Sequence, residues 1–332
     1  MVASAAAEAR DQIRIVGSST VFPFSTTVAE QFSNSSDFKT PVVESTGTGG
    51  GLKLFCAGLG VEHPDVTNAS RRIKQSEVDL CAKNGVVDIT EVGIGYDGIV
   101  LANAKESAPM AITLRQLFLA LAKNVPANED GSELMENPYT TWQEIDPSLP
   151  DVAIEVLGPP PTSGTRDAFA ELALEGGCKT FAGITAMRQV DRDRYKGVCH
   201  GIREDGAYVE AGENDVLIIQ KLLANPDAFG VFGFSFLDQN ADRVQGSLIG
   251  GVEPTFEDIS DGKYPISRSM FFYVKDAHVG VIPGIAEFVE EFTAERAWSE
   301  DGYLADKGLI PLSDEDRRRT RDHASALAPL SL

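Results

Sequence analysis

Apolar and polar positions follow two periods along this chain, one typical of strands and one typical of helices. Residues 13–16 alternate and are β-branched, and apolar positions then recur at Val21, Phe24, Val28 and Phe32, the spacing of one helix face. Further strands are predicted at 41–44, 92–101, 152–157, 228–236 and 264–274, and further helices at 52–55, from about 76 through Cys81, and at 113–123, 168–174, 213–224 and 285–297. Strands that alternate with helices predict an α/β protein with helices on both faces of its sheets.

Several segments between or within these elements have a clear local signature. Thr113 is placed to cap its helix, and either Glu213 or Asn214 stands near the start of another. Trp142 is expected in the core rather than as a stacking platform. The polar stretch 124–138 predicts a loop, and the mixed charge run 313–323 predicts a solvated surface.

Short hydroxyl residues and glycines gather at the strand-to-helix turns 17–20, 45–51, 67–70 and 162–165. The first turn of a helix has unpaired N–H groups and the positive end of the helix dipole, so such turns suit an anion. Arg71 follows the third turn and Arg166 the fourth, and a planar guanidinium suits an oxyanion. Each turn alone is equally explained by an ordinary Ser/Thr cap with an exposed arginine. Four such turns together favour a seat for a small tetrahedral anion.

The glycine-rich turn 45–51 matches no nucleotide-binding motif. Leu52 stands where both the P-loop and the dinucleotide fingerprint require glycine. We therefore expect these glycines and hydroxyls to form a nest of backbone N–H groups for an anion that carries no nucleotide.

The composition limits the partners of this protein. The chain has 332 residues, enough for two α/β domains, and no apolar run approaches the ~20 residues of a membrane span. The formal net charge of −21 argues against nucleic acid and anionic membranes. It does not exclude an anionic ligand, because salt screens remote carboxylates beyond about 8 Å.

The cysteines and the N-terminus both indicate an oxidising compartment. Cys56 and Cys81 form one local pair and Cys178 and Cys199 another, so two disulfides are expected, with four buried free thiols as the alternative. No histidine stands at ligand spacing to a cysteine, which argues against zinc. Residues 1–10 are alanine-rich with an A-x-A pattern, which predicts either the remnant of a cleaved signal peptide or a disordered leader.

Ordered motifs connect the chain to a known family. They are Gly17-Ser-Ser-Thr-Val-Phe-Pro23, Thr46-Gly-Thr-Gly-Gly-Gly51, Asn68-Ala-Ser-Arg71, Ser163-Gly-Thr-Arg-Asp167 and Tyr264-Pro-Ile-Ser-Arg268. Together they resemble the phosphate-binding proteins of the high-affinity phosphate ABC importer (PstS type), which are type II periplasmic binding proteins. The resemblance extends over about residues 13–311.

This resemblance implies a fold of two lobes, each a mixed sheet flanked by helices, joined by two hinge crossings. Lobe I would comprise residues 11–97 and 268–332, and lobe II residues 98–267. Closure around dehydrated phosphate is expected through the passages 96–99 and 265–269. The resemblance further implies a monomeric, periplasmic, non-enzymatic protein that needs no metal or cofactor and delivers phosphate to a membrane permease.

The resemblance also implies a ligand set. It comprises the Thr20 hydroxyl, the backbone at Val21 and Phe22, the hydroxyls of Thr48 and Ser70, the Ser163 hydroxyl, the Gly164 N–H, and the hydroxyl and N–H of Thr165. The chain departs from the best-studied members twice, with Arg71 in place of an aspartate and Pro159 in place of an arginine. We expect Arg71 and Arg166 to offset the two charges of the ligand. Asp97 is the candidate acceptor for the proton of the ligand.

Alternative functions follow from the same residues. Another tetrahedral oxyanion, such as sulfate, molybdate or arsenate, is the first alternative, because the aspartate is missing. A phosphatase-like enzyme is the second, although the chain lacks G-x-S-x-G and H-E-x-x-H motifs and Ser163 has no visible base. A surface protein that reuses the fold is the third.

Overall fold

The computed structural model of this protein describes residues 10–161, 163–212 and 215–332. The chain divides into two compact units: unit 1 is Met1–Tyr96 with Arg268–Leu332, and unit 2 is Asp97–Ser267. The chain therefore passes from one unit to the other after Tyr96 and returns after Ser267. Unit 1 is built from both ends of the sequence, whereas unit 2 is one continuous segment.

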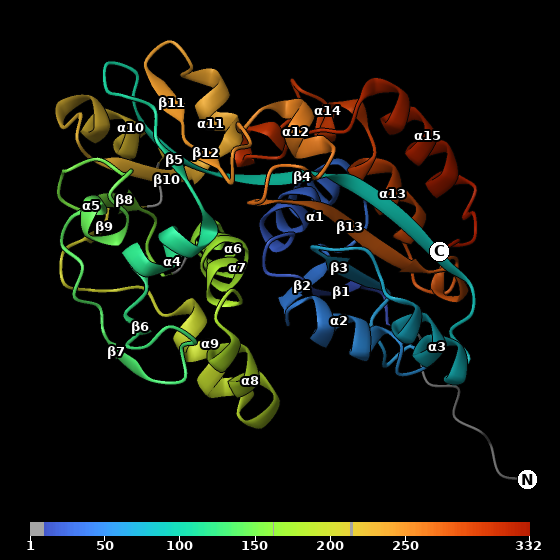
Figure 1. The fold of residues 1–332 in the computed structure, drawn as a ribbon. Helices are drawn as coiled ribbons and strands as arrows, with labels where there is room; N and C mark the ends of the chain where they lie inside the picture. The colour runs from blue at the N-terminus through green and yellow to red at the C-terminus, as the bar shows by residue number, and fades with distance from the viewer. Residues whose placement is uncertain (1–9, 162, 213–214) are drawn as a thin grey trace, which may run out of the picture. The chain divides into compact units, whose positions relative to one another are not determined.

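In unit 1 five strands form a sheet with helices on both faces, and the fifth strand continues into unit 2 (Figure 1). Its elements are β1 (Arg14–Gly17), α1 (Phe22–Ser35), β2 (Val42–Ser45), α2 (Thr48–Phe55), β3 (Val66–Ala69), α3 (Gln75–Lys83), the first half of β4 (Ile89–Ala104), β13 (Ser267–Lys275), α13 (Ile285–Phe292), α14 (Glu295–Trp298) and α15 (Asp314–Ser325). The strand order is β2-β1-β3-β13-β4. Strand β1 is parallel to β2 and β3, and β13 is antiparallel to β3.

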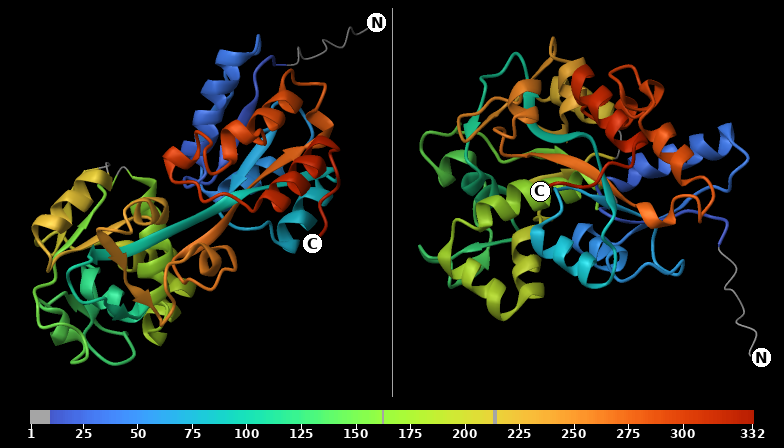
Figure 2. Two further views of the ribbon diagram at one scale, coloured as in Figure 1. Left: turned by 90° about the horizontal axis from the view of Figure 1, so that it is seen from above. Right: turned by 90° about the vertical axis from the view of Figure 1, so that its right-hand side faces the viewer.

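Each face of this sheet has its own core. On one face α1 and α13 lie side by side, and Phe272 of β13 packs with them (Figures 1 and 2). On the other face the next residue, Tyr273, packs with α2 and α3. Successive strand residues point to opposite faces, so β13 contributes to both cores.

Unit 2 is built around the second half of β4. Its further elements are β5 (Ala111–Ile112), α4 (Leu114–Leu121), β6 (Asn124–Pro126), β7 (Leu134–Glu136), α5 (Trp142–Ile145), β8 (Val156–Gly158), α6 (Gly164–Phe169), a π-helix (Ala170–Leu174), α7 (Glu175–Cys178), α8 (Ala182–Val190), α9 (Arg192–His200), β9 (Tyr208–Glu210), α10 (Asp215–Ala224), β10 (Phe229–Gly233), α11 (Phe234–Gln239), β11 (Val244–Gly246), β12 (Leu248–Ile249) and α12 (Phe256–Ser260). The order β4-β10-β8-β9 brings the carboxyl ends of the parallel strands β10, β8 and β9 to one edge.

Both predicted disulfides are present. Cys56 is bonded to Cys81 and Cys178 to Cys199, and all four residues are fully buried. Trp142 is also fully buried, as expected. The Thr113 cap is confirmed, since its hydroxyl accepts a hydrogen bond from the N–H of Gln116. The cap predicted at Glu213 or Asn214 lies outside the described residues.

Three predicted elements differ from the structure, one in type and two in extent. The polar stretch 124–138 contains the hairpin β6–β7. The strand expected at 228–236 ends at Gly233, where α11 begins. The helix expected at 285–297 is interrupted after Phe292, because the Thr293 hydroxyl donates back to the carbonyl of Val289 and Ala294 is extended.

The charge run 313–323, predicted as a solvated surface, forms most of helix α15, and all of its residues except Arg317 are exposed or half-buried. Ser313 caps it by accepting a hydrogen bond from the N–H of Asp316. Arg317 is buried and forms ion pairs with Glu295 and Asp314. The helix therefore has one face on the unit 1 core and a charged face in water.

Candidate functional site

The first turn of unit 1 is shaped by close backbone contacts. Gly17 ends β1 with a φ of 129°, and a Cβ there would lie 2.2 Å from the carbonyl oxygen of Asn68. The Ser18 N–H donates to this same carbonyl at 3.0 Å, and the Thr20 N–H donates to the Ser18 hydroxyl. Thr20 is thereby held at the entrance of α1. Val21 is fully buried.

The glycine-rich turn forms a helix and not the nest predicted from its sequence. Helix α2 begins at Thr48, so Gly49, Gly50 and Gly51 form its first turn. A Cβ at Gly51 would lie 2.4 Å from the Cα of Gly17. This glycine therefore lets the helix approach β1, a packing role that overrides the weak helix propensity of glycine.

The hydroxyls of the second and third turns meet. The Thr48 and Ser70 hydroxyl oxygens lie 3.1 Å apart and share a hydrogen bond. The Ser70 N–H also donates to the Thr48 oxygen at 3.1 Å. The second turn follows β2 and the third follows β3. Since both strands are parallel to β1, their carboxyl ends place these two turns at the same edge of the sheet.

Arg268 of β13 brings a positive charge to this edge. Its guanidinium donates to the Thr20 hydroxyl and reaches the Ser70 hydroxyl at 3.5 Å. Because β13 is antiparallel to β3, its first residues lie beside the last residues of β3. Thr20, Thr48, Ser70 and Arg268 thus form one polar group, which we call the unit 1 cluster.

Arg71 is engaged by a carboxylate. Its two terminal nitrogens donate to both oxygens of Glu77 at 2.7 and 2.9 Å, the bidentate geometry typical of strong pairs. Burial alone would raise the pKa of Glu77, but the hydrogen bonds from Arg71 and from the N–H of Lys74 outweigh it and lower the pKa. The Arg71 side chain is about one-third exposed, and this pair ties the third turn to α3.

The donors of unit 2 all come from one helix start. Ser163 is the N-cap of α6, and its hydroxyl accepts a hydrogen bond from the Thr165 N–H at 3.2 Å. Gly164 is the first helical residue. The helix follows β8, whose carboxyl end lies beside those of β9 and β10. The Ser163 turn is thus a cap, as the simpler interpretation expected, and it also presents helix N–H groups at this edge.

Arg166 is mostly buried rather than exposed. Only 13% of its side chain is accessible, and its guanidinium lies over the Tyr208 ring and pairs with Glu210 at 3.0 Å. Burial raises the pKa of Tyr208 to about 12, against the lowering effect of the Arg166 charge. The Tyr208 hydroxyl donates to the carbonyl of Pro159 at 3.0 Å, which fixes the loop before Ser163.

The chemistry available at these edges is hydrogen-bond donation and positive charge. In the described part of the chain, no histidine or carboxylate is hydrogen-bonded to the hydroxyls of Thr20, Thr48, Ser70 or Ser163. Nor do these described ranges contain a group of three or more His, Cys, Asp or Glu side chains that could hold a metal. Such donors suit a small oxyanion.

Sequence reasoning included Arg268 in a motif but did not assign it to the site. The available signal was one cationic residue at the start of the apolar β run 264–274. Asp97, the predicted proton acceptor, is the first residue of unit 2 and lies in β4.

Known proteins resemble this chain over most of its length. A family model described as the PBP superfamily domain matches residues 2–296. Protein SphX of Synechococcus elongatus is 29% identical over 266 residues, 78% of this chain and 67% of that protein. The phosphate-binding protein PstS of Staphylococcus saprophyticus is 25% identical over 306 residues, 90% of this chain and 80% of that protein.

A solved structure shares the fold. It is the crystal structure of a possible phosphate-binding protein from Planctomyces limnophilus, with 26% identity and a TM-score of 0.74, and the match covers 96% of this chain and 98% of the other. The predicted two-lobed binding-protein fold is therefore confirmed. Across the residues that the structure describes, no helix combines the length and apolar character needed to span a membrane.

Proposed function

Because this chain belongs to the PBP superfamily, we propose that it is a solute-binding protein that captures inorganic phosphate and delivers it to the permease of an ABC importer. The observation that carries the proposal is the unit 1 cluster, in which Arg268 joins the hydroxyls of Thr20 and Ser70. Relatives named as phosphate-binding proteins support the choice of ligand.

One phosphate ion takes donors from both units in this proposal. Unit 1 supplies the hydroxyls of Thr20, Thr48 and Ser70, the backbone at Val21 and Phe22, and the guanidinium of Arg268. Unit 2 supplies the Ser163 hydroxyl, the Gly164 and Thr165 N–H groups, the Thr165 hydroxyl and Arg166. Hydrogen bonds from hydroxyls, N–H groups and guanidinium replace the water around the ion.

Arg268 and Arg166 bring positive charge to the ion in this proposal, although Arg166, like Arg71, already has a carboxylate partner, Glu210. Arg71 stays a candidate ligand, but its terminal nitrogens already serve Glu77, so its main contribution is to orient the turn that carries Ser70. A guanidinium committed to a carboxylate contributes less net charge to a neighbouring anion.

The same proposal has three further parts. The two units close around the ion, the protein acts as a monomer in the periplasm after removal of a signal peptide, and it binds phosphate without catalysing a reaction. The disulfides Cys56–Cys81 and Cys178–Cys199 support an oxidising compartment. Relatives such as PstS of Staphylococcus saprophyticus are binding proteins by name, which supports capture rather than turnover.

Selectivity against sulfate depends on an acceptor for the phosphate proton. The third turn has Arg71 where the best-studied members have an aspartate, and Asp97 is the candidate that remains. Without such an acceptor, sulfate, which has no proton to give near neutral pH, competes more effectively.

Calorimetric titration with phosphate, followed by competition with sulfate, arsenate and molybdate, tests the proposal. Saturable phosphate binding, with weaker binding of sulfate, is expected. If sulfate or molybdate binds more tightly than phosphate, that anion and not phosphate is the ligand. An assay with a chromogenic phosphate ester tests the enzymatic alternative, and turnover comparable to that of ordinary phosphatases would establish it.

A further inference from the structure

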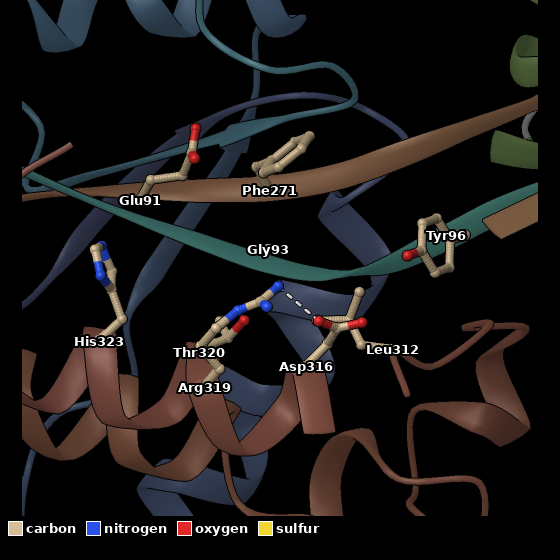
Figure 3. Close-up of a pocket in the computed structure, with 9 residues that line it drawn as sticks. All are labelled: Glu91, Gly93, Tyr96, Phe271, Leu312, Asp316, Arg319, Thr320 and His323. Atoms are coloured by element: carbon tan, nitrogen blue, oxygen red, sulfur yellow. Dashed lines mark hydrogen bonds and ion pairs between the residues drawn. The ribbon is translucent and has the colours of Figure 1, made fainter. Parts of the chain in front are cut away.

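Unit 1 contains a cavity away from the cluster described above. Its volume is about 340 Å³. It lies between strands β4 and β13 and helix α15 (Figure 3). The residues that line it are Glu91, Gly93, Tyr96, Phe271, Leu312, Asp316, Arg319, Thr320 and His323.

The cavity arises because the C-terminal segment is fastened to β4 on both sides of α15. Before the helix, Ile310 exchanges backbone hydrogen bonds with Tyr96 at 2.7 and 3.1 Å. After it, the Leu330 N–H donates to the carbonyl of Ile89 at 2.9 Å. Helix α15 spans the distance between these attachments without pairing with the strand. The cavity is therefore walled mostly by regular elements, with Leu312 from the segment before α15.

Gly93 opens the cavity across the strand. In Figure 3 the side chains of Arg319 and His323 rise from α15 on one side of β4, while Phe271 and Glu91 lie on the other. A Cβ at Gly93 would lie 3.7 Å from the Phe271 ring. The absence of a side chain leaves space for an apolar group against this ring.

The carboxylates of the cavity already have donors. Glu91 accepts hydrogen bonds from Arg72 and from the Tyr273 hydroxyl. Asp316 accepts from Arg319 and from the Ser313 hydroxyl. A cationic ligand would therefore have to compete with partners that are in place.

The donors on α15 are less committed. Arg319 uses one terminal nitrogen for Asp316, and its remaining N–H groups make no hydrogen bond to the described residues. Within the described ranges neither the Thr320 hydroxyl nor the His323 ring makes a hydrogen bond, although the charge of His323 acts on the Asp276 carboxylate. Arg319 and His323 are four residues apart, so they lie on one helix face.

We propose that this cavity binds a small carboxylate with a flat apolar body, its carboxylate on Arg319 and His323 and its ring against Phe271. The volume suffices, because cavities of about 150 Å³ already accept benzene. An aromatic ring prefers an offset or edge contact with Phe271. The occupant would also contact Tyr96, the last residue before the chain enters unit 2.

Benzoate is the probe for the first test, by saturation-transfer NMR on the full chain with saturating phosphate present. Phosphate keeps benzoate from the proposed oxyanion site, so this test succeeds or fails independently of the phosphate proposal. Benzoate is expected to bind at least about tenfold more tightly than benzylamine. Equal or tighter binding of benzylamine would overturn the proposal in favour of a cation site, and absence of benzoate binding at about 10 mM would also overturn it.

A double variant, Arg319→Ala with His323→Ala, tests the residues. It should weaken benzoate binding about tenfold or more, because both donors to the carboxylate are removed. The matched control is Arg318→Ala, an exposed neighbour on the same helix that does not line the cavity, and it should change binding less than about twofold. Equal effects of the two changes contradict the proposal.

A crystal soaked with 4-iodobenzoate locates the ligand directly. The anomalous signal of iodine is expected beside Phe271 and Gly93. A signal only at other positions, including the unit 1 cluster, would overturn the proposal.

Discussion

The two units carry similar polar groups but assemble them differently. In unit 1, Thr20, Thr48, Ser70 and Arg268 come from separate turns and from a strand near the other end of the chain. In unit 2, Ser163, Gly164, Thr165 and Arg166 are consecutive residues of one helix start. The first arrangement depends on strand order, and the second depends on one capped helix.

The arginines show what this difference means. Arg166 stands next to its hydroxyls in the sequence and is held over Tyr208 by local contacts. Arg71 also stands next to a hydroxyl, yet it pairs with Glu77, and Arg268 lies beside Ser70 instead. Arg71 and Arg166 thus each follow a hydroxyl residue and pair with a carboxylate, whereas Arg268 reaches Thr20 and Ser70 from a distant part of the sequence.

The largest expected effect on binding is that of Arg268→Ala. Loss of its charged hydrogen bonds should weaken phosphate binding by about 1.5–3 kcal/mol, or roughly 10- to 150-fold. Calorimetric titration measures this change. Arg72→Ala, which removes a surface arginine paired with Glu91, is the control and should leave affinity within about twofold. An Arg268 variant that binds as tightly as the parent would contradict the role of the cluster.

The stability of unit 2 should depend on pH through Glu175. This residue begins α7, which follows α6 and the π-helix in the sequence. The hydrogen bond from His200 lowers the pKa of Glu175 from 4.5 to about 2, against the raising effect of burial, and Lys179 adds to the lowering. Because this pKa is lower in the folded state, the stabilisation is present above pH 4.5 and is lost as pH falls toward 2.

Between pH 4.5 and about pH 3 the free energy of unfolding of the parent should fall by about 2 kcal/mol because Glu175 becomes protonated, since one pKa unit corresponds to about 1.4 kcal/mol. The variant Glu175→Gln lacks this group, so its free energy of unfolding should not show that part of the fall. Urea unfolding of the full chain at several pH values measures it. The exposed residue Glu133 provides the control Glu133→Gln. Parallel stability curves for the Glu175 variant and the parent would refute the assignment.

Neutral donors should matter less than Arg268 in either unit. Thr48→Ala and Ser163→Ala each remove a hydroxyl, worth about 0.5–1.5 kcal/mol or roughly 2- to 13-fold in phosphate affinity. The Ser163 change should also destabilise α6, since it removes the N-cap. Comparing affinity with melting temperature separates these effects. A loss equal to that of Arg268→Ala would argue against charge as the leading contribution.

The smallest effect on affinity is expected for Arg71→Ala. The change removes the pair with Glu77 and should lower stability by about 1 kcal/mol while phosphate affinity falls less than about threefold. The same titration and a thermal melt measure both. A loss of affinity as large as that of Arg268→Ala would restore Arg71 as a direct ligand.

Local patterns in the sequence predicted much of the fold. The alternation of 13–16 and the helical spacing from Val21 to Phe32 correspond to β1 and α1. The cysteine spacings predicted both disulfides. These features depend on residues close together in the chain, where periodicity and loop closure are informative.

The features that were missed depend on tertiary contacts. Helix α2 starts at Thr48 because Gly51 packs against Gly17, which no local rule contains. Arg268 reaches Thr20 and Ser70 because β13 lies between β3 and β4, an order that periodicity cannot give. Arg71 forms an ion pair with Glu77, which lies six residues away on the next helix.

The position of β13 between β3 and β4 has a consequence for biosynthesis. Unit 1 lacks an interior strand and the aromatic residues Phe272, Phe288 and Trp298 until the last part of the chain has left the ribosome. Unit 2 is complete by Ser267 and is free to fold first. The nascent N-terminal segment must therefore wait, unfolded and open to proteases or chaperones, for a partner more than 160 residues downstream.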